Sequence, residues 1–444
     1  MVPPPRRLRS VSDDAPKSPL RTILAGRAFL GGRLQPVEIA IDEDGRIRSV
    51  GKVRTGAPRH DVGDRVILPA ATDLHVHLRE PGGPAEAETI PTGTVAAAVG
   101  GVGLVGEMPN TVPPVVDADA ARAKAGRVPG RAAVDVLLYA SPTVPRARAE
   151  LARVAGGFKL YLSPTTGMEA PPPMTEVPEL LRALAGLGLP VAVHAEDPRQ
   201  FAGPERPRTP VDWNLSRPPR AELAAVEVLS RAPDALRLHV AHVTTVEAAD
   251  RLRARGFSFE ATPHHLLLSD RSGPDARTKV NPPLRSEAER ARLWEAFRRG
   301  NVPVLASDHA PHPLAEKSLP FDRAPSGVPG VETLLPLMLA RVRAQELDLA
   351  TLLLAACERP ARWLGQPIGR IAPGHRANLL VVDFRRRTAV EGRRLHSACG
   401  WTPFEGWEAI FPEEHYRDGA RIVEAGEYVG PASGRVVRPE YAPS

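Results

Sequence analysis

The chain has 444 residues, 42% of them hydrophobic, which is enough to bury the core of one large barrel or of two to three ordinary domains. Its formal charge of +6 is scattered among acidic residues instead of forming a basic stripe, which argues against nucleic-acid binding. No stretch is apolar enough for a membrane helix, and Cys357 and Cys399 are too few for a disulfide framework, so we expect a cytoplasmic protein.

The chain begins with a Pro- and Arg-rich segment, residues 1–20, that we expect to be a mobile tail. Residues 21–68 alternate polar and apolar positions between tight turns, which predicts short strands. From residue 69 the pattern changes to strand, loop and helix. Apolar runs of strand length follow at Val102–Glu107, Ala133–Tyr139, Gly157–Leu162, Pro190–His194, Leu236–His242, Phe257–Thr262 and Val302–Ser307.

Amphipathic segments such as Thr175–Leu187 and Ala221–Arg231 separate these runs. With the strand around residue 75 the runs number eight, so residues 69–370 are predicted to form a (β/α)8 TIM-like barrel of the α/β class. Helices over Val331–Gln345 and Leu349–Leu364 close this region. Residues 371–444 return to short strands, and we expect them to join residues 21–68 in a small β-sandwich domain.

Two histidines stand two positions apart in the apolar run Asp73-Leu-His75-Val-His77-Leu-Arg79. Residues i and i+2 of a strand project from the same face, so both imidazoles are predicted to point the same way. A strand presents two metal ligands in this manner. Asp73 shares that face but lies deeper, which favours a supporting role over direct contact.

Three further residues with metal-binding side chains end predicted strands: His194, His242 and Asp308. The active site of a TIM barrel lies at the carboxyl ends of its strands, so ligands distant in sequence can converge there. This nitrogen-rich set with one carboxylate suits Zn²⁺ or a similar divalent ion. Four other histidines, His239, His264, His265 and His309, are expected to support these ligands or to pack in the core.

Lys159 lies within the apolar strand segment Gly157-Phe-Lys-Leu-Tyr161, although the chain has only six lysines among its 58 Lys and Arg residues. Burial of an ammonium group lowers its pKa toward the neutral amine, which reacts with CO₂ to give a carbamate. A carbamate has two oxygens and can bridge two metal ions. The alternative is a lysine whose ammonium extends from the strand end to solvent.

The segments His75-Val-His77-Leu-Arg79-Glu-Pro-Gly82, Met108-Pro-Asn110-Thr and Ser307-Asp-His-Ala-Pro-His312, the last followed by Glu316-Lys317, resemble the dihydroorotase family of the amidohydrolase superfamily. The resemblance spans about residue 22 to the C-terminal region. It implies the same barrel beside a β-sandwich made from both chain ends. It also implies reversible cyclisation of N-carbamoyl-L-aspartate to L-dihydroorotate in de novo pyrimidine (UMP) biosynthesis, with a hydroxide activated by two divalent metal ions, expected to be Zn²⁺.

The same resemblance implies a role for each site residue. His75, His77 and Asp308 would bind one ion, His194 and His242 the other, and carboxylated Lys159 both, while Asp308 would also carry the proton as the catalytic residue. Arg79, Asn110 and His312 would hold the substrate carboxylate. Asn281 is expected to line the pocket through its backbone.

Two other functions remain open. Allantoinases, hydantoinases and dihydropyrimidinases share the metal ligands, although Arg79 suits a substrate carboxylate that hydantoins and dihydropyrimidines lack. A non-catalytic dihydroorotase-like partner of aspartate transcarbamoylase would have lost ligands that this chain keeps. We expect a small-molecule substrate, a homo-oligomer, and an association with aspartate transcarbamoylase as a further option.

Overall fold

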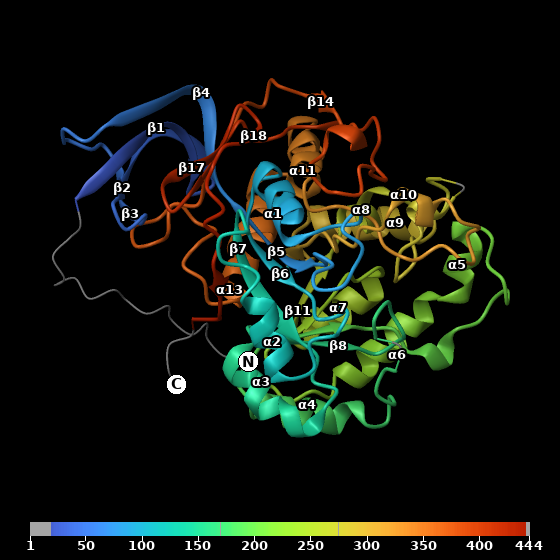
Figure 1. Ribbon diagram of the computed structural model, residues 1–444. Coiled ribbons are helices and arrows are strands. Elements are labelled where there is room, and N and C mark those ends of the chain that lie inside the picture. The colour runs from blue at the N-terminus through green and yellow to red at the C-terminus, as the bar shows by residue number, and fades with distance from the viewer. Residues whose placement is uncertain (1–18, 169, 274, 441–444) are drawn as a thin grey trace.

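The computed structural model describes residues 19–168, 170–273 and 275–440. The predicted tail over residues 1–20 falls almost entirely outside these residues. Two parts make up the fold, a barrel of parallel strands and a sheet formed by both ends of the chain (Figure 1).

Eight parallel strands form the barrel in sequence order, each hydrogen-bonded to the next. They are fully or almost fully buried, as parallel strands covered on both faces must be. Their bounds are β5 Ala71–Val76, β6 Val102–Glu107, β7 Asp135–Ala140, β8 Gly157–Tyr161, β9 Val191–His194, β10 Leu238–Val240, β11 Ser258–Ala261 and β12 Val304–Leu305. The barrel closes where His309, just past β12, forms a parallel bridge with Val76 of β5.

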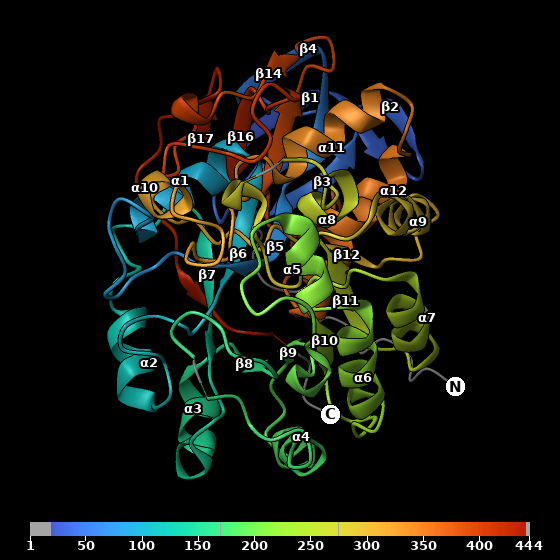
Figure 2. The same cartoon turned by 90° about the vertical axis from the view of Figure 1, so that its right-hand side faces the viewer.

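Helices surround the strands (Figure 2). In α4, Val177, Leu180, Leu181 and Leu184 recur every three or four residues and are buried, so one face packs on the barrel. The main helices are α1 Ile90–Val99, α2 Ala118–Ala125, α3 Arg148–Val154, α4 Val177–Ala185, α6 Pro219–Leu229, α7 Val246–Ala254, α9 Glu287–Arg298 and α11 Leu334–Arg343. Short helices in the connections are η1 Pro145–Ala147, η2 Pro198–Gln200, α5 Pro210–Ser216, α8 Pro263–Leu267, η3 Ala276–Thr278 and α10 Leu314–Lys317.

The helical stretch expected over residues 349–364 consists of three contiguous segments: α12 Leu349–Leu353, the π-helical η4 Leu354–Glu358 and α13 Arg359–Trp363. Pro360 lies at the start of α13 and has no N–H, so the α-helical hydrogen-bond ladder cannot run through it unchanged. The structure confirms the helical stretch and adds a π-helical turn in its middle.

The two chain ends combine in one mixed eight-stranded sheet with the order β18-β17-β16-β13-β4-β1-β2-β3. Its own core contains Leu24, Ile39, Ile67, Leu379 and Tyr416. The strands are β1 Leu20–Leu30, β2 Arg33–Asp42, β3 Ile47–Gly51, β4 Arg59–Pro69, β13 Leu379–Val382, β16 Glu414–Arg417, β17 Ala420–Glu424 and β18 Glu427–Tyr428. The structure therefore confirms a TIM barrel with an additional sheet domain.

Parts of the C-terminal region return to the barrel. The strand β19 Val436–Val437 pairs in parallel with β7, and Ile410 N–H donates to the Pro336 carbonyl of α11 at 3.0 Å. Ile410 directly follows β15 Glu408–Ala409, which pairs with β14 Thr388–Ala389 in a two-stranded sheet, and η5 Gly392–Arg394 lies in the long connection between those strands. The boundaries at residues 20, 68 and 370 stay predictions. None of the helices among the described residues has the length and apolar character needed to cross a membrane.

Candidate metal centre and substrate cleft

One cleft lies at the carboxyl ends of the barrel strands and encloses about 420 Å³, part of it open to solvent. It is the place where a TIM barrel carries its active site. Its walls come from eight separate segments of the chain, and nearly all of the lining side chains are polar. The lining residues are His75, His77, Arg79, Asn110, Tyr161, Thr165, Thr166, His194, His242, Asn281, Asp308, Ala310, Ser326 and Gly327.

Four of the predicted ligands meet at the floor of this cleft. Asp308 Oδ1 lies 3.3 Å from His75 Nε2 and 3.2 Å from His77 Nε2. His75, His77 and Asp308 each offer a ligand atom, and these atoms lie within 4.8 Å of one another. Lys159 Nζ is 3.2 Å from His75 Nε2. Lys159 is fully buried, so the alternative of an ammonium reaching solvent is wrong.

The other two predicted ligands form a pair beside this cluster. His194 Nδ1 and His242 Nε2 are 3.0 Å apart, and the His242 ring centroid lies 5.2 Å from that of His75. The buried Nδ1 of His242 has no hydrogen-bond partner among the described residues. All six predicted ligands therefore come together although they span more than two hundred positions of the sequence.

Three of the histidines are oriented by a hydrogen bond from the nitrogen that faces away from the cluster. His75 Nδ1 donates to Glu260 at 2.8 Å, His77 Nδ1 to Asn110 at 2.7 Å, and His194 Nε2 to Glu196 at 2.8 Å. Metal-binding histidines are held in this way, with one nitrogen fixed and the other free to coordinate. The donor set fits a divalent metal ion, and His75, His77 and Asp308 form a buried cluster with the spacing to hold one.

Burial keeps these imidazoles neutral. It lowers the pKa of His75, His77 and His242 well below the usual range, and nearby cationic groups such as Lys159 act in the same direction. Burial also lowers the pKa of His194, against the opposing effect of Glu196. Neutral imidazole is the form that binds a metal ion, so no proton has to be displaced from these rings.

Lys159 and Asp308, the two remaining groups of the cluster, have pKa values shifted in opposite directions. Burial lowers the pKa of Lys159 to about 8, while Glu260 and Asp308 oppose the shift. Burial raises the pKa of Asp308 to about 6, while Lys159 opposes it. An amine that loses its proton near neutral pH and a carboxyl that can gain one are both suited to chemistry at this site.

Arg79 lines one wall of the cleft, and His312 lies next to it without being among the lining residues. Arg79 Nη2 is 3.2 Å from His312 Nε2, and Arg79 Nε donates to the Pro311 carbonyl at 2.9 Å. Both side chains are buried, so the guanidinium is held near the metal cluster instead of extending to solvent. The neighbouring acid, Glu80, pairs with Arg131 at 3.0 Å and not with Arg79.

Asn110 and Asn281 also line the cleft, but neighbouring residues engage both amides. Asn110 Oδ1 accepts from His77 Nδ1 and, at 3.1 Å, from Tyr161 Oη. Asn281 Oδ1 accepts from Trp213 Nε1 at 3.1 Å. In this arrangement the Asn110 amide orients His77, and its contact with a substrate carboxylate stays a prediction.

Several residues of the site were missed in the sequence, among them Glu260, Tyr161 and Glu196, which accepts from His194. Glu260 accepts from both His75 and His239, at 2.8 Å each, and a lone acid inside the apolar strand β11 was the available signal. Tyr161 lies two residues after Lys159 on β8, so strand alternation already placed it on the same face. The supporting role expected for His239 agrees with its bond to Glu260.

Comparison with known proteins identifies the class. Residues 66–394 match the model of the amidohydrolase family, so the chain belongs to this family. Among curated proteins it is 37% identical to a dihydroorotase of Halobacterium salinarum, over 94% of this chain and 99% of that protein. It is 33% identical to a dihydroorotase of Thermoplasma acidophilum, over 93% and 96% of the two chains. Within the amidohydrolases, the chain is a member of the dihydroorotase group.

Solved structures show the same architecture. An L-hydantoinase (dihydropyrimidinase) from Arthrobacter aurescens superposes with a TM-score of 0.87 at 26% identity, over 94% of this chain and 100% of that chain. A dihydropyrimidinase from Brevibacillus agri gives a TM-score of 0.83 at 25% identity, over 95% and 100%. The chain is thus a cyclic amide hydrolase by family, with dihydroorotases as its relatives in sequence.

Proposed function

We propose that this protein is a dihydroorotase that interconverts N-carbamoyl-L-aspartate and L-dihydroorotate in pyrimidine biosynthesis. The observation that carries the proposal is the position of Arg79 and His312 beside the metal cluster, at 3.2 Å from each other. A buried guanidinium suits a substrate that carries a carboxylate next to its cyclic amide. The identity of the dihydroorotase relatives over most of the chain supports the same assignment.

The ligand set supports two divalent ions, which we expect to be Zn²⁺. His75, His77 and Asp308 would hold one, and His194 and His242 the other. When bound, such a pair lowers the pKa of a water molecule and polarises an amide carbonyl. A carbamate on Lys159 would contact both ions. It forms when the neutral Nζ attacks CO₂ and releases a proton, and the pKa of about 8 that burial gives Lys159 favours that neutral amine.

Asp308 is the group that moves the proton. In the hydrolytic direction its carboxylate takes a proton from the attacking water and delivers it to the departing ring nitrogen. Ring closure reverses these two transfers. Burial supports this exchange because it raises the pKa of Asp308 to about 6, closer to neutral pH than that of an ordinary aspartate.

A paired assay tests the proposal. Metal content per chain and the mass of the Lys159 peptide are measured on one preparation, and turnover is compared on dihydroorotate and on hydantoin. We expect two metal ions, the added mass of one CO₂ on Lys159, and turnover of dihydroorotate only. Turnover of hydantoin without dihydroorotate would replace the proposal with the cyclic amidase alternative that the hydantoinase structures suggest.

An inactive preparation that holds both metals would favour the non-catalytic alternative. The intact ligand set argues against it, because each predicted metal-binding side chain lies in the cleft or on its floor. A cytoplasmic location is supported by the two cysteines, which are buried free thiols. The homo-oligomer and the association with aspartate transcarbamoylase stay predictions.

A further inference from the structure

A short segment of the C-terminal region, residues 396–401, packs against the supports of the catalytic cleft. We call it the strap. It follows η5 and precedes β15, so it belongs to none of the barrel strands. Its first residue anchors it: His396 N–H donates to Glu332 Oε2 at 2.7 Å, and His396 Nδ1 lies 2.8 Å from Glu332 Oε1. Two further strap residues, Ser397 and Trp401, then reach the neighbours of site residues.

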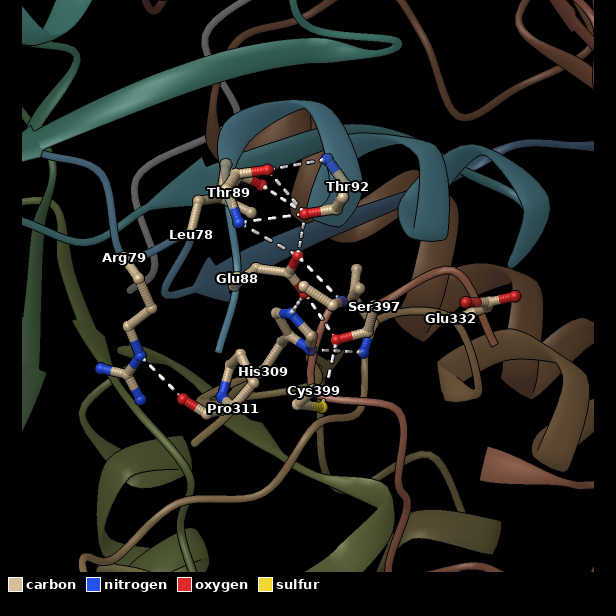
Figure 3. A network of polar contacts seen from close by, with 12 residues as sticks. Leu78, Arg79, Glu88, Thr89, Thr92, His309, Pro311, Glu332, Ser397 and Cys399 are labelled. Atoms are coloured by element: carbon tan, nitrogen blue, oxygen red, sulfur yellow. Dashed lines mark hydrogen bonds and ion pairs between the residues drawn. The ribbon is translucent and has the colours of Figure 1, made fainter. Parts of the chain in front are cut away.

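Ser397 contacts the acid that holds His309. Glu88, fully buried just before α1, accepts from Ser397 Oγ at 2.6 Å and from His309 Nε2 at 2.9 Å, both on Oε2 (Figure 3). The His309 Nδ1 accepts from Gly330 N–H at 3.1 Å. Since Nδ1 is an acceptor, Nε2 carries the proton, and the ring is fixed from both sides.

The backbone of His309 is connected to two of the predicted metal ligands. It directly follows Asp308, whose φ of 44° is in the left-handed region, and its carbonyl accepts from His77 N–H at 2.7 Å. A shift of His309 would therefore also move its neighbours Asp308 and His77, two of the predicted metal ligands. A chain of contacts runs from Ser397 through Glu88 and His309 to the proton-carrying carboxylate.

Trp401 contacts the other half of the site. Its Nε1 donates to the His312 carbonyl at 2.8 Å, and its side chain is almost fully buried. The His312 ring in turn lies against Arg79. Trp401 therefore fixes the backbone of a residue that faces the substrate carboxylate in the proposed reaction.

We propose that Ser397 and Trp401 are positioning residues of the strap with separate tasks. Ser397 sets Asp308 through Glu88 and His309, and Trp401 sets His312 beside Arg79. The inference rests on the proposed dihydroorotase function. Because one contact leads to the proton carrier and the other to the carboxylate-binding wall, the two residues affect different kinetic constants.

Two mild variants and two matched controls test this division. Ser397→Ala and Trp401→Phe each remove one hydrogen-bond donor, while Ser49→Ala on β3 and Trp407→Phe near β15 are the controls. We expect Trp401→Phe to raise KM for dihydroorotate about tenfold with kcat nearly unchanged, and Ser397→Ala to lower kcat about tenfold with KM nearly unchanged. Ser397→Thr, which restores the hydroxyl, should recover kcat. Kinetic constants are expressed per metal-loaded chain, so loss of folded protein cannot imitate either result.

The outcomes separate this inference from the proposed function. Suppose that the wild-type protein turns over dihydroorotate. If Ser397→Ala and Trp401→Phe then behave like the controls, or both lose kcat to the same extent, the positioning roles alone are wrong. Failure of Ser397→Thr to recover what Ser397→Ala loses would overturn the role of Ser397. Wild-type protein that does not turn over dihydroorotate would overturn the proposed function, and the strap's catalytic role with it.

Discussion

Asp308 combines a strained backbone, a buried carboxyl and contacts to two histidines, which makes it the most demanding position of the site. We expect Asp308→Asn to lower kcat by about 10²- to 10⁴-fold, because the amide cannot accept and return a proton. Metal content is measured in parallel, and Asp322→Asn on the exposed surface is the matched control. Near-normal turnover of Asp308→Asn would contradict the assignment of the proton carrier.

Arg79 should act on binding more than on chemistry. Arg79→Lys keeps the charge but loses the planar fork, so we expect KM for dihydroorotate to rise about tenfold or more while kcat changes little. Initial rates over a range of substrate concentrations give both constants. A fall in kcat at constant KM would indicate instead that Arg79 supports the metal cluster.

At this scale the sequence predicted which side chains the fold brings together in the cleft. Strand alternation placed His75 and His77 on one face, and the scarcity of lysine drew attention to Lys159 within an apolar strand. Trp401 gave no such signal, because its hydrogen bond to the His312 carbonyl joins segments 89 residues apart. Local patterns cannot report a partner that only the folded chain brings near.

At the scale of elements, the lower half of β7 depends on the C-terminal strand β19. The pairing of β7 with β8 begins only at Tyr139, and β19 pairs with β7 at Val136 and Leu137. Arg438 then extends to α3, where its Nε donates to the Ala155 carbonyl at 3.1 Å. The final residues thus cover part of a barrel strand and one helix end.

Gly434 permits this close approach. A Cβ at position 434 would lie 2.0 Å from the Val134 carbonyl oxygen, so Gly434→Ala must displace the segment. We expect it to destabilise the protein by about 1–3 kcal/mol, seen as a lower apparent Tm at a fixed heating rate. Gly186→Ala is the control, since the nearest atom to its Cβ is 3.7 Å away. Equal Tm values for the two variants would show that β19 contributes little.

The predicted bounds were accurate for fully buried strands such as β6, and less accurate at the ends of others. The segment predicted as strand over residues 102–107 coincides with β6, whereas the one over 236–242 shrinks to β10, residues 238–240. Residues 237 and 241 still bond to β9 through their backbones, and His242, with a φ of 37°, lines the cleft. Apolar runs mark buried chain, and they do not distinguish a strand from the turn that presents its last residue.

At the scale of the whole molecule, one buried histidine joins the sheet domain to the barrel. His415 on β16 donates from Nδ1 to the Ala98 carbonyl of α1 at 2.8 Å, and burial lowers its pKa to about 4. The neutral ring is favoured in the folded state, so its contribution to stability is complete above the unfolded pKa of about 6.5 and is lost as the pH falls toward about 4.

We therefore expect acid to destabilise this interface. Between about pH 7.5 and pH 5, His415 should account for a loss of about 2 kcal/mol, so the apparent Tm of the wild type should fall more than that of His415→Asn. All other titrating groups are common to both proteins, and the difference isolates His415. Parallel Tm curves would contradict this account.

The arrangement of domains was only partly accessible from the sequence. Short strands at both ends predicted a shared β-sandwich domain, and the structure has both ends in one eight-stranded sheet. Residues 396–401 and 434–438 nevertheless contact the barrel, through Glu88, His312 and Ala155. These contacts depend on the path that each connecting segment takes after it leaves the sheet. The alternation of polar and apolar residues in a strand does not specify that path.

Arg79, His242 and Asp308 have φ angles of 61°, 37° and 44°, a region that disfavours every side chain with a Cβ. Each such residue costs roughly 1–2 kcal/mol, which the surrounding core must offset. Glycine at any of the three would relieve that cost and remove the reactive group at once. Selection of variants for thermal stability alone would therefore favour glycine at these three positions. Such variants would be more stable and would lack catalytic activity.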